Sequence, residues 1–505
     1  MTNTLIDALA APSIDRLSDV FATRPNAPDV TFGALWDGAG RFATTLLDLG
    51  VKPGDRVAVQ VPKSLEALQL YLGTVMAGGF FLPLNTAYTP AEVSYFLGNA
   101  TPRVFVCDPG ALDALGPVAT EAGCTHLETL DASGDGTLAT NARTATPLTT
   151  PISRGPEDLA AILYTSGTTG RSKGAMLSHR ALLSNSQTLT DLWRFTSKDV
   201  LIHALPIYHT HGLFVASNVA LLSGASVVFL PGFDADAILD VMPTATSLMG
   251  VPTFYTRLLA DPRLTKDRAA NMRLFISGSA PLVADTHAAW EARTGHRILE
   301  RYGMTETNMN TSNPYDGDRR AGTVGFPLPD VELRVMGDAG EVAPGEIGII
   351  EVRGPNVFSG YWQMAEKTAE DLRPDGWFIT GDLGRVDADG YVTIVGRGKD
   401  LIITGGFNVY PKEVEAAIDA IPGVSESAVI GVPHPDFGEG VVAVVVPDGT
   451  VPIKKAQILA ELSVCLAKFK QPKEVVFVDA LPRNTMGKVQ KAALRETYKG
   501  ALSGA

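Results

Sequence analysis

The sequence predicts a multi-domain α/β protein. We expect a large N-terminal domain of α/β sheets with a small β-rich subdomain, hinged to a small mobile α+β C-terminal domain. Three observations favour this: strand and helix patterns alternate over the first part of the chain, short strands separated by turns follow beyond residue 325, and a separate α+β pattern fills the end. A chain of 505 residues is also long enough to form several hydrophobic cores.

The N-terminal part alternates helices and strands. Residues 31–49 place apolar side chains at helical spacing, and Gly50 ends that helix. A turn and strand over 51–61 and a helix over 65–79 follow. Further strands are expected at 80–85 and 103–108, and the polar, Gly-, Thr- and Pro-rich residues 133–157 predict a surface connection.

A short loop with the sequence YTSGTTGRSKGAMLSH, residues 164–179, carries the clearest chemical signal. We expect an apolar strand before it, over 159–163, and a helix after it. Glycines let successive backbone N–H groups converge on one anion, hydroxyls add donors, and Lys173 adds a mobile positive charge. The loop lacks the Walker A spacing, because Lys173 is followed by Gly174. It predicts a polyphosphate cradle, most simply for ATP; the alternative is a flexible surface loop.

The alternation resumes after this loop and then changes character. Strand-like and helical segments are expected through the middle of the chain at 201–212, 213–222, 226–230, 247–259, 272–282, 284–294 and 296–307. Short strands at 331–336, 348–354 and 391–396 predict the β-rich subdomain. The C-terminal pattern comprises a helix from Pro411, strands at 427–432 and 441–446, a helix at about 454–467 and a strand at 474–478. We place the domain boundaries at 1–396, a hinge at 397–399, and 400–505.

The composition excludes some classes of function. A net charge of −13 argues against nucleic acid or an anionic membrane as the main partner. Cys107, Cys124 and Cys465 are scattered without metal-ligand spacing and fit reduced thiols in a cytoplasmic enzyme. The N-terminus lacks the pattern of a signal peptide, and no apolar run reaches the roughly 20 residues of a membrane span.

Four further motifs carry candidate site residues. SGSAPL at 277–282 follows a strand, where α/β sheets usually bind ligands, and RYGMTET at 301–307 offers Glu306 as a Mg²⁺ ligand. TGDLG at 380–384 places Asp382 in a predicted turn, where it could accept from ribose hydroxyls, and PRNTMGKVQK at 482–491 presents Lys488. Taken alone, each motif is better explained by a turn, a surface acid or a solvated lysine.

Together and in this order, YTSGTTGRSKG, YGMTE, TGDLG, GRGKDLIITGGFNVYP and PRNTMGK resemble the adenylate-forming superfamily. That superfamily contains acyl-CoA synthetases, luciferases and peptide-synthetase adenylation domains, and the resemblance covers about residues 30–495. It implies two steps. A carboxylate first attacks the α-phosphate of ATP to give acyl-AMP and pyrophosphate, and a thiol, that of coenzyme A, then displaces AMP.

The resemblance also implies roles for individual residues. The catalytic residues would be Lys488, which bridges the α-phosphate and the carboxylate, together with Glu306 and His209; His209 would shape the acyl and thiol tunnel. Thr165 and Glu306 would lie near Mg²⁺, Lys399 would be the hinge, and Gly405 and Gly406 would contact coenzyme A. The remaining ATP- and AMP-binding positions would be Thr165, Ser166, Gly167, Thr168, Thr169, Gly170, Lys173, Ser279, Ala280, Tyr302, Gly303, Met304, Thr305, Asp382 and Arg397.

Within the superfamily, the chain is most similar to its malonate-activating branch, the malonate–CoA ligases. The stretches LPIYHTHGLF, MGVPTFYTRLL, LFISGSAPL and ERYGMTETNMNTSNPYDGDRR carry this resemblance. Arg257, in an apolar context, would form a forked ion pair with the free carboxylate of the substrate, at about 1.5–3 kcal/mol per charged hydrogen bond. Thr210 and Ser277 would assist, and Thr210 and Met304 would limit the C2 substituent. Spacing alone equally allows a surface Arg257 paired with Asp261.

Several alternatives stay open from the sequence. The acid could be another short or aromatic one, and the use of methylmalonate is undecided. Less favoured are a freestanding adenylation domain that loads a carrier protein, a nucleotide-binding regulator without catalysis, and a luciferase-like second activity.

We expect small-molecule partners, no nucleic acid or membrane, and a monomer or weak oligomer. Lysines matching Lys488 are acetylated in some relatives, so a lysine acetyltransferase is a further candidate partner.

Overall fold

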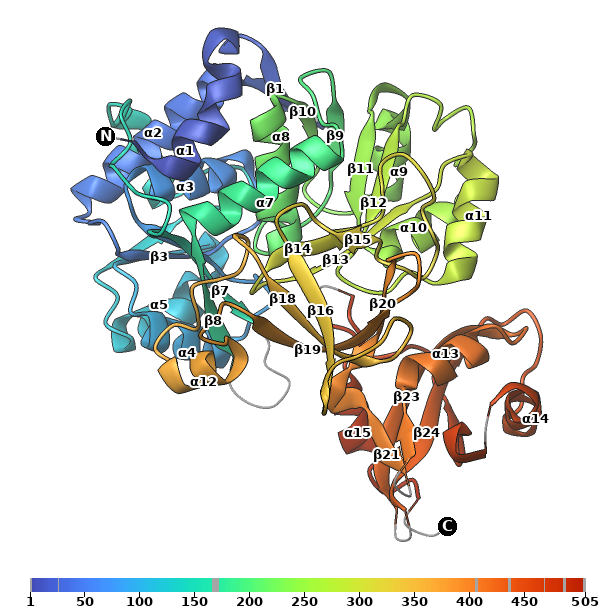
Figure 1. Cartoon of the computed structure of the whole chain (residues 1–505). Helices are drawn as coiled ribbons and strands as arrows, with labels where there is room; N and C mark the ends of the chain where they lie inside the picture. Colours follow the sequence, from blue (N-terminus) through green and yellow to red (C-terminus); the bar gives the residue numbers. More distant parts are fainter. Residues whose placement is uncertain are drawn as a thin grey trace. The chain divides into compact units, whose positions relative to one another are not determined.

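The computed structural model describes residues 2–25, 27–165, 172–404, 407–434, 437–466, 468–484 and 487–502. By contacts the chain divides into two compact units. The first comprises Met1–Ala321, Gly325–Glu332 and Val352–Phe378, and the second comprises Gly322–Val324, Leu333–Glu351 and Ile379–Ala505. The predicted class, a large α/β N-terminal part with β-rich and α+β parts after it, is confirmed (Figure 1). The boundary at 397–399 stays a prediction.

A six-stranded sheet has the strand order β6-β5-β3-β4-β7-β8. It is parallel except for the last pair, in which β7 and β8 form an antiparallel hairpin. Buried aromatic and aliphatic side chains, among them Leu82, Phe96 and Phe105, fill its core. The strands are β3 (Arg56–Gln60), β4 (Phe80–Pro83), β5 (Val104–Cys107), β6 (His126–Thr129), β7 (Leu159–Thr165) and β8 (Lys173–Ser178).

A nine-stranded sheet has the order β15-β14-β13-β12-β11-β9-β10-β1-β2. Its central strands are parallel, so the carboxyl ends of β9, β11, β12 and β13 meet at one edge. The strands are β1 (Val20–Arg24), β2 (Ala27–Thr31), β9 (Val200–His203), β10 (Ser226–Phe229), β11 (Ser247–Gly250), β12 (Leu274–Ser277), β13 (Leu299–Met304), β14 (Asn308–Ser312) and β15 (Phe326–Pro327).

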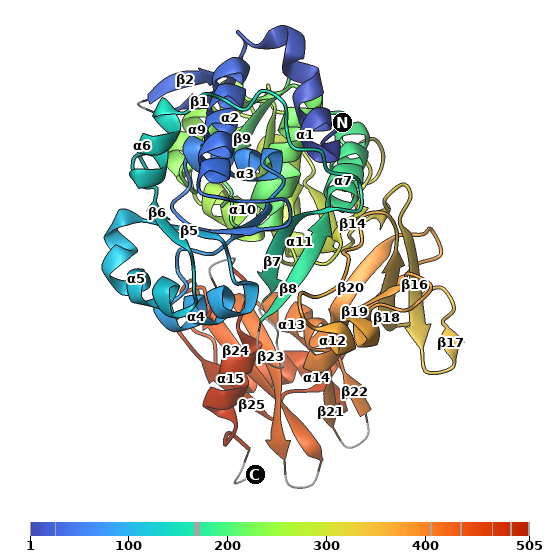
Figure 2. The same ribbon diagram turned by 90° about the vertical axis from the view of Figure 1, so that its left-hand side faces the viewer.

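Helices of the first unit pack in groups beside these sheets. α2 buries Leu35, Ala39, Phe42 and Leu46 at helical spacing and contacts α3 and α6 (Figure 2). Helices α1, α7 and α8 contact one another, and α9, α10 and α11 lie together beside β11 (Figure 1). These helices are α1 (Thr4–Ala10), α2 (Phe32–Asp48), α3 (Leu65–Met76), α4 (Pro90–Ala100), α5 (Leu112–Glu121), α6 (Thr137–Thr144), α7 (His179–Leu192), α8 (Asn218–Ser223), α9 (Ala235–Val241), α10 (Pro252–Leu259), α11 (Ala284–Thr294) and α12 (Ala365–Asp371).

The second unit contains most of a five-stranded sheet, ordered β17-β16-β18-β19-β20, and a C-terminal sheet in which β21, β24 and β23 are neighbours. Interlocking valine and isoleucine side chains form the core of the C-terminal sheet. The elements are β16 (Glu332–Gly337), β17 (Gly340–Glu341), β18 (Gly348–Arg353), β19 (Phe378–Val386), β20 (Val392–Arg397), β21 (Ile402–Thr404), β22 (Phe407–Val409), α13 (Pro411–Asp419), β23 (Val424–His434), β24 (Gly438–Pro447), α14 (Lys455–Cys465), β25 (Glu474–Phe477) and α15 (Lys491–Tyr498).

Short helical turns complete the described chain. The most consequential is η3 (His211–Ser217), a π-helix that continues into α8 where a single α-helix was expected. The other turns, all 3₁₀, are η1 (Ala11–Arg16), η2 (Pro109–Ala111), η4 (Met242–Thr244), η5 (Gly398–Asp400) and η6 (Lys468–Lys470).

Two local predictions were wrong. The helix expected after residues 164–179 is confirmed as α7, which begins at His179, but residues 173–178, which were expected to belong to the loop, form strand β8 and pair with β7. Because KGAMLS pairs with β7, Lys173 is the first residue of a strand. The predicted connection 133–157 contains helix α6, whose Leu138, Ala139 and Ala142 are buried despite a mostly polar sequence.

Candidate active site

The β7–β8 hairpin brings Thr165 and Lys173 opposite each other. Their Cα atoms are partners in the antiparallel register, and Thr165 Oγ1 donates to the carbonyl oxygen of Lys173 at 3.5 Å. The predicted phosphate-binding residues between them, Ser166, Gly167, Thr168, Thr169 and Gly170, lie outside the described residues. The two ends of the predicted cradle are therefore placed, and its centre stays a prediction.

Lys173 is held by an aromatic ring and a carboxylate. Its Nζ donates to Tyr361 Oη at 3.0 Å, lies 4.1 Å from the centroid of that ring, and is 3.4 Å from Asp371 Oδ2. Tyr361 precedes α12 and Asp371 ends it, so a segment far away in sequence positions the lysine. Neither residue was identified from the sequence.

Glu306 belongs to the same cluster. It is buried, and its Oε1 accepts a hydrogen bond from Tyr361 Oη at 3.1 Å. Burial is the main cause that raises the pKa of Tyr361, followed by the negative charges of Glu306 and Asp371, so the phenol stays a neutral donor. Thr165, Lys173, Tyr361 and Glu306 thus form one connected polar cluster.

This cluster fits Mg²⁺ only together with a nucleotide. Among the described residues, no group of three or more His, Cys, Asp or Glu side chains could hold a metal ion by itself. Mg²⁺ typically takes one or two carboxylates plus phosphate oxygens and water, and Glu306 with the Thr165 hydroxyl matches that donor set. The two residues could therefore hold the ion where phosphates complete its coordination.

The loops after β12 and along β13 border one edge of the nine-stranded sheet. Ser279 has φ +70°, an uncommon conformation for a residue other than glycine that is often found at functional sites. A Cβ on Gly303 would lie 1.9 Å from the carbonyl oxygen of Asn308, which explains the need for glycine there. Six predicted ATP- and AMP-binding residues are partly exposed at this edge: Ser279, Ala280, Tyr302, Gly303, Met304 and Thr305.

Three predicted acyl-pocket residues come from the same region. Thr210 and Ser277 are buried, and their hydroxyl oxygens have no hydrogen-bond partner among the described residues. His209, one residue before Thr210, is partly exposed just ahead of η3. Unpartnered buried hydroxyls are uncommon and suit groups that hydrogen-bond to a ligand.

Arg257 is exposed, which differs from the buried setting expected from its apolar neighbours. On α10 the residues Phe254, Tyr255 and Leu258 face the core, whereas the Arg257 guanidinium lies 5.5 Å from the centroid of the Phe233 ring. The alternative partner Asp261 is bound by Arg263 instead. The role of Arg257 toward a substrate stays a prediction.

In the second unit, Asp382 and Arg397 face each other across two strands. Their Cα atoms are in register on β19 and β20, and Arg397 Nε lies 3.0 Å from Asp382 Oδ1. The expected turn at Asp382 was wrong: TGDLG lies inside β19, where Gly381 takes φ +70° and the register shifts at Leu383. The buried carboxylate is thus held by a strand pair.

The predicted hinge and catalytic lysines lie farther along this unit. Lys399 is exposed within η5, and partial desolvation, followed by the charge of Arg397, lowers its pKa to about 8. Lys488 is half-buried; Asn484 N donates to the Lys488 carbonyl and Lys488 N donates to Asn484 Oδ1, both at 2.9 Å. The predicted coenzyme A contacts Gly405 and Gly406 lie outside the described residues. The roles of all four residues stay predictions.

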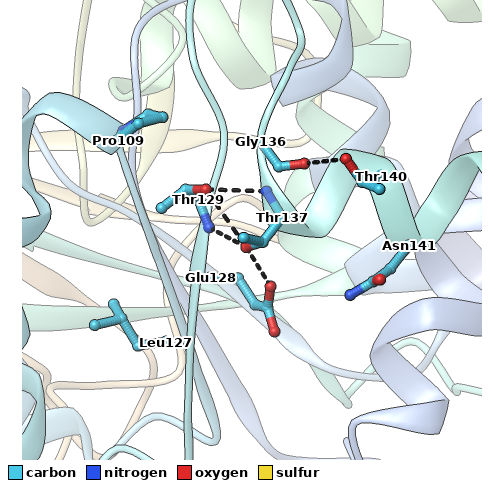
Figure 3. Close-up of a pocket in the computed structure, with 8 residues that line it drawn as sticks. All are labelled: Pro109, Leu127, Glu128, Thr129, Gly136, Thr137, Thr140 and Asn141. Carbon is cyan, nitrogen blue, oxygen red and sulfur yellow. Dashed lines mark hydrogen bonds between the residues drawn. The ribbon is translucent and has the colours of Figure 1, made fainter.

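A separate hollow of about 680 Å³ lies between β6 and α6 (Figure 3). None of the predicted site residues lines it, and its polar groups bond to one another. Thr137 N donates to Thr129 Oγ1 at 2.9 Å, and Thr137 Oγ1 donates to Glu128 Oε2 at 2.5 Å. Because Glu128, Thr129 and Thr137 are already bonded to one another, we assign the hollow no ligand.

No helix in the described part of the chain is long and apolar enough to cross a membrane.

Comparisons with known proteins agree with this arrangement. The family model of AMP-binding enzymes matches residues 15–362, and that of the C-terminal domain of AMP-binding enzymes matches residues 413–488. A malonate–CoA ligase of Arabidopsis thaliana is 34% identical over 483 residues, which cover 89% of this chain and 79% of that protein. A sulfoacetate–CoA ligase of Cupriavidus necator is 37% identical over 473 residues, 92% of each chain. The crystal structure of ATP-bound MatB from Rhodopseudomonas palustris is 61% identical, with a TM-score of 0.97 over 99% of this chain and 100% of that chain.

Proposed function

The chain belongs to the family of AMP-binding enzymes and is an ATP-dependent acid–thiol ligase that works through an acyl adenylate, and we propose that the acid it activates is malonate. The observation that supports this most is the likeness to MatB over nearly the whole of both chains, together with a relative named as a malonate–CoA ligase. The products would be malonyl-CoA, AMP and pyrophosphate.

In the first step, a carboxylate oxygen of malonate attacks the α-phosphorus of ATP. The bond to the bridging oxygen breaks and pyrophosphate leaves with the electron pair. We assign Lys173, already fixed by Tyr361 and Asp371, to the leaving phosphates, since a positioned cation offsets charge that develops in the transition state. Glu306 and Thr165 would hold Mg²⁺, which supplies further positive charge at the phosphates.

In the second step, the thiolate of coenzyme A attacks the malonyl carbonyl carbon. The bond to the AMP oxygen breaks, and AMP leaves as the thioester forms. We assign Lys488 to the first step, where it would bridge the α-phosphate and the reacting carboxylate, and His209 to the acyl and thiol tunnel. Asp382 would accept hydrogen bonds from the ribose hydroxyls, with Arg397 beside it.

A second candidate acid is sulfoacetate, because the ligase named for it is 37% identical over 92% of each chain. Malonate and sulfoacetate share one chemical feature: each is acetate that carries a second anionic group on C2. The proposed site therefore has to recognise a distal negative charge, whichever of the two acids is used.

The test is steady-state turnover of the purified protein with Mg-ATP and coenzyme A. Malonate, methylmalonate, sulfoacetate, succinate, acetate, propionate and coumarate are supplied separately, and AMP and the mass of the thioester are measured. We expect malonyl-CoA to form with a kcat/KM at least about 100-fold above that for acetate or propionate, since an unpaired site cation disfavours monocarboxylates. Faster turnover of coumarate or propionate would contradict the proposal, and faster turnover of sulfoacetate would favour the second candidate.

A further inference from the structure

Arg301 is a buried cation for which the described residues supply no carboxylate partner. Its side chain lies on β13, the residue is only 4% exposed, and Nε and Nη2 have no hydrogen-bond partner among the described residues. Other well-shielded arginines are paired: Arg273 binds Asp199, and Arg334 binds Glu351. Among the described residues, Arg301 is more deeply buried than these two arginines and lacks such a carboxylate.

Among the described residues, no carboxylate compensates the charge of Arg301. Burial lowers its pKa to about 9, so the guanidinium remains protonated at neutral pH. The neighbouring phenol of Tyr255 is fully buried, its pKa is raised well above the ordinary value, and its Oη donates to the carbonyl oxygen of Ile276 at 2.6 Å. A buried charge is costly unless something pairs with it, which points to an anion supplied from outside.

The position of Arg301 is the edge of the sheet that carries the predicted acyl residues. A Cβ built on Gly278 would lie 2.4 Å from Arg301 Cζ, so the guanidinium rests directly against the loop after β12. His211, which follows Thr210, lies close enough for the Arg301 charge to lower its pKa, although burial is the larger cause. Its Nδ1 is 3.4 Å from Ser279 Oγ.

Neutral polar groups complete this environment. His211 is neutral because its pKa lies well below the ordinary value, and its Nε2 is buried without a partner among the described residues. The Thr210 hydroxyl oxygen, from the preceding residue, is also buried and unpartnered. One cation and two neutral hydrogen-bonding groups form a set that suits a small anion.

We infer that the Arg301 guanidinium binds the distal anionic group of the acid and is the residue that selects a C2-anionic substrate. This inference rests on the proposed function and deepens it. The carboxylate that does not react accepts hydrogen bonds from Nε and Nη2, the forked geometry that arginine offers and lysine does not. A monocarboxylic acid leaves the cation buried and unpaired, and is rejected for that reason.

Arg257 is the competing arginine, and the two differ in environment. Arg257 is exposed on α10 and stacks over Phe233, so water screens its charge. Arg301 is shielded from water and makes no ion pair within the described residues, so an ion pair formed there is stronger. We therefore place the main discrimination at Arg301.

The test compares two acids that differ in one charge: malonate and monomethyl malonate, whose distal group is a neutral ester. The kcat/KM of each acid is measured for the wild type and for Arg301→Gln, Arg257→Gln and Arg263→Gln. Arg263 is an exposed arginine paired with Asp236 and Asp261, so Arg263→Gln is the matched control. We expect Arg301→Gln to lower kcat/KM for malonate about 100-fold and to change that for monomethyl malonate less than about 3-fold.

Gly278→Ala is an independent variant, because its Cβ would displace the guanidinium without removing it. Like Arg301→Gln, it should lower kcat/KM for malonate relative to kcat/KM for monomethyl malonate. Retained melting temperature and ATP binding in Arg301→Gln exclude unfolding as the cause.

The outcomes separate this inference from the proposed function. If the wild type uses malonate and Arg301→Gln keeps that activity within about 3-fold, the inference is wrong and the function stands. The inference is also wrong if Arg257→Gln alone abolishes the preference for malonate over monomethyl malonate. It is likewise wrong if Arg301→Gln loses activity with both acids together with ATP binding. If the wild type does not use malonate, the proposed function is wrong. Turnover of sulfoacetate is then compared with turnover of propionate to test Arg301. Equal turnover of these two acids by the wild type would overturn the inference as well.

Discussion

Two charged sites in the first unit differ in how their charges are satisfied. Tyr361 contacts both Lys173 and Glu306, and Asp371 is a second partner for the lysine. Arg301, on the edge of the nine-stranded sheet, has no such partner among the described residues. The protein itself therefore holds the first site in place, whereas we infer that the second obtains its counter-charge from the bound substrate.

Breaking the first site should have the largest effect. Glu306→Gln removes the carboxylate that Tyr361 contacts and that is assigned to Mg²⁺, so we expect kcat/KM for ATP to fall on the order of 10²–10³-fold. The rate of AMP formation at saturating malonate measures this. A change of less than about 3-fold would mean that Glu306 serves only packing.

Two substitutions at arginine sites should affect stability differently. Loss of the carboxylate that pairs with Arg273 should destabilise the protein, whereas loss of Arg301 should not. Asp199→Ala leaves Arg273 without its carboxylate, and we expect the free energy of unfolding to fall by about 3 kcal/mol. Arg301→Met removes a cation for which the described residues supply no carboxylate, so the stability of this variant should equal or exceed that of the wild type. Urea unfolding without ligands measures both variants. Strong destabilisation by Arg301→Met would show that Arg301 serves the fold.

Tyr361→Phe tests how much the Tyr361 hydroxyl contributes to the site that contains Lys173 and Glu306. It removes the hydroxyl that contacts both Lys173 Nζ and Glu306 Oε1 and keeps the ring beside the lysine. We expect kcat/KM for ATP to fall about 10-fold, as for the loss of hydrogen bonds to charged groups. Malonate binding at the second site should not change, so an altered ratio of malonate to monomethyl malonate would contradict the separation of the two sites.

The smallest expected effect is a pH dependence of stability from a buried neutral histidine. Burial, followed by the charge of Arg154, lowers the pKa of His179 to about 4, and Leu5 N donates to its Nδ1 at 3.3 Å. Below pH 6.5 the unfolded chain binds a proton there that the folded chain does not, so stability falls as the pH drops from 6.5 to 4. The loss should reach about 1 kcal/mol at pH 5.5. His179→Gln should flatten this part of the unfolding profile, and an unchanged slope would contradict the assignment.

The sequence predicted the elements that have strong periodicity and the loops that carry several specific residues. The helix expected at 31–49 is α2, and SGSAPL does follow the end of β12. Helix α6 was missed because few apolar residues mark its buried side. Asp382 was predicted to lie in a turn because TGDLG contains two glycines. In the structure this segment pairs with β20 and belongs to strand β19.

Arg301 illustrates what pattern analysis of the site did not find. Arg257 was predicted to bind the substrate because apolar residues surround it in sequence, but on α10 those neighbours face the core and Arg257 is exposed. A signal did exist for Arg301: two residues after buried Leu299, it shares a face of β13 with an apolar position. Tyr361 and Asp371 gave no comparable signal, since only tertiary folding brings them to Lys173.

The most direct test of the proposed function is the exchange of labelled pyrophosphate into ATP in the absence of coenzyme A. This exchange requires a reversible acyl adenylate and therefore reports the acid and the first half-reaction together. We predict rapid exchange with malonate and at least about 100-fold slower exchange with acetate or monomethyl malonate at equal concentration. Equal exchange with acetate, or none with malonate, would contradict the proposal that this ligase selects malonate.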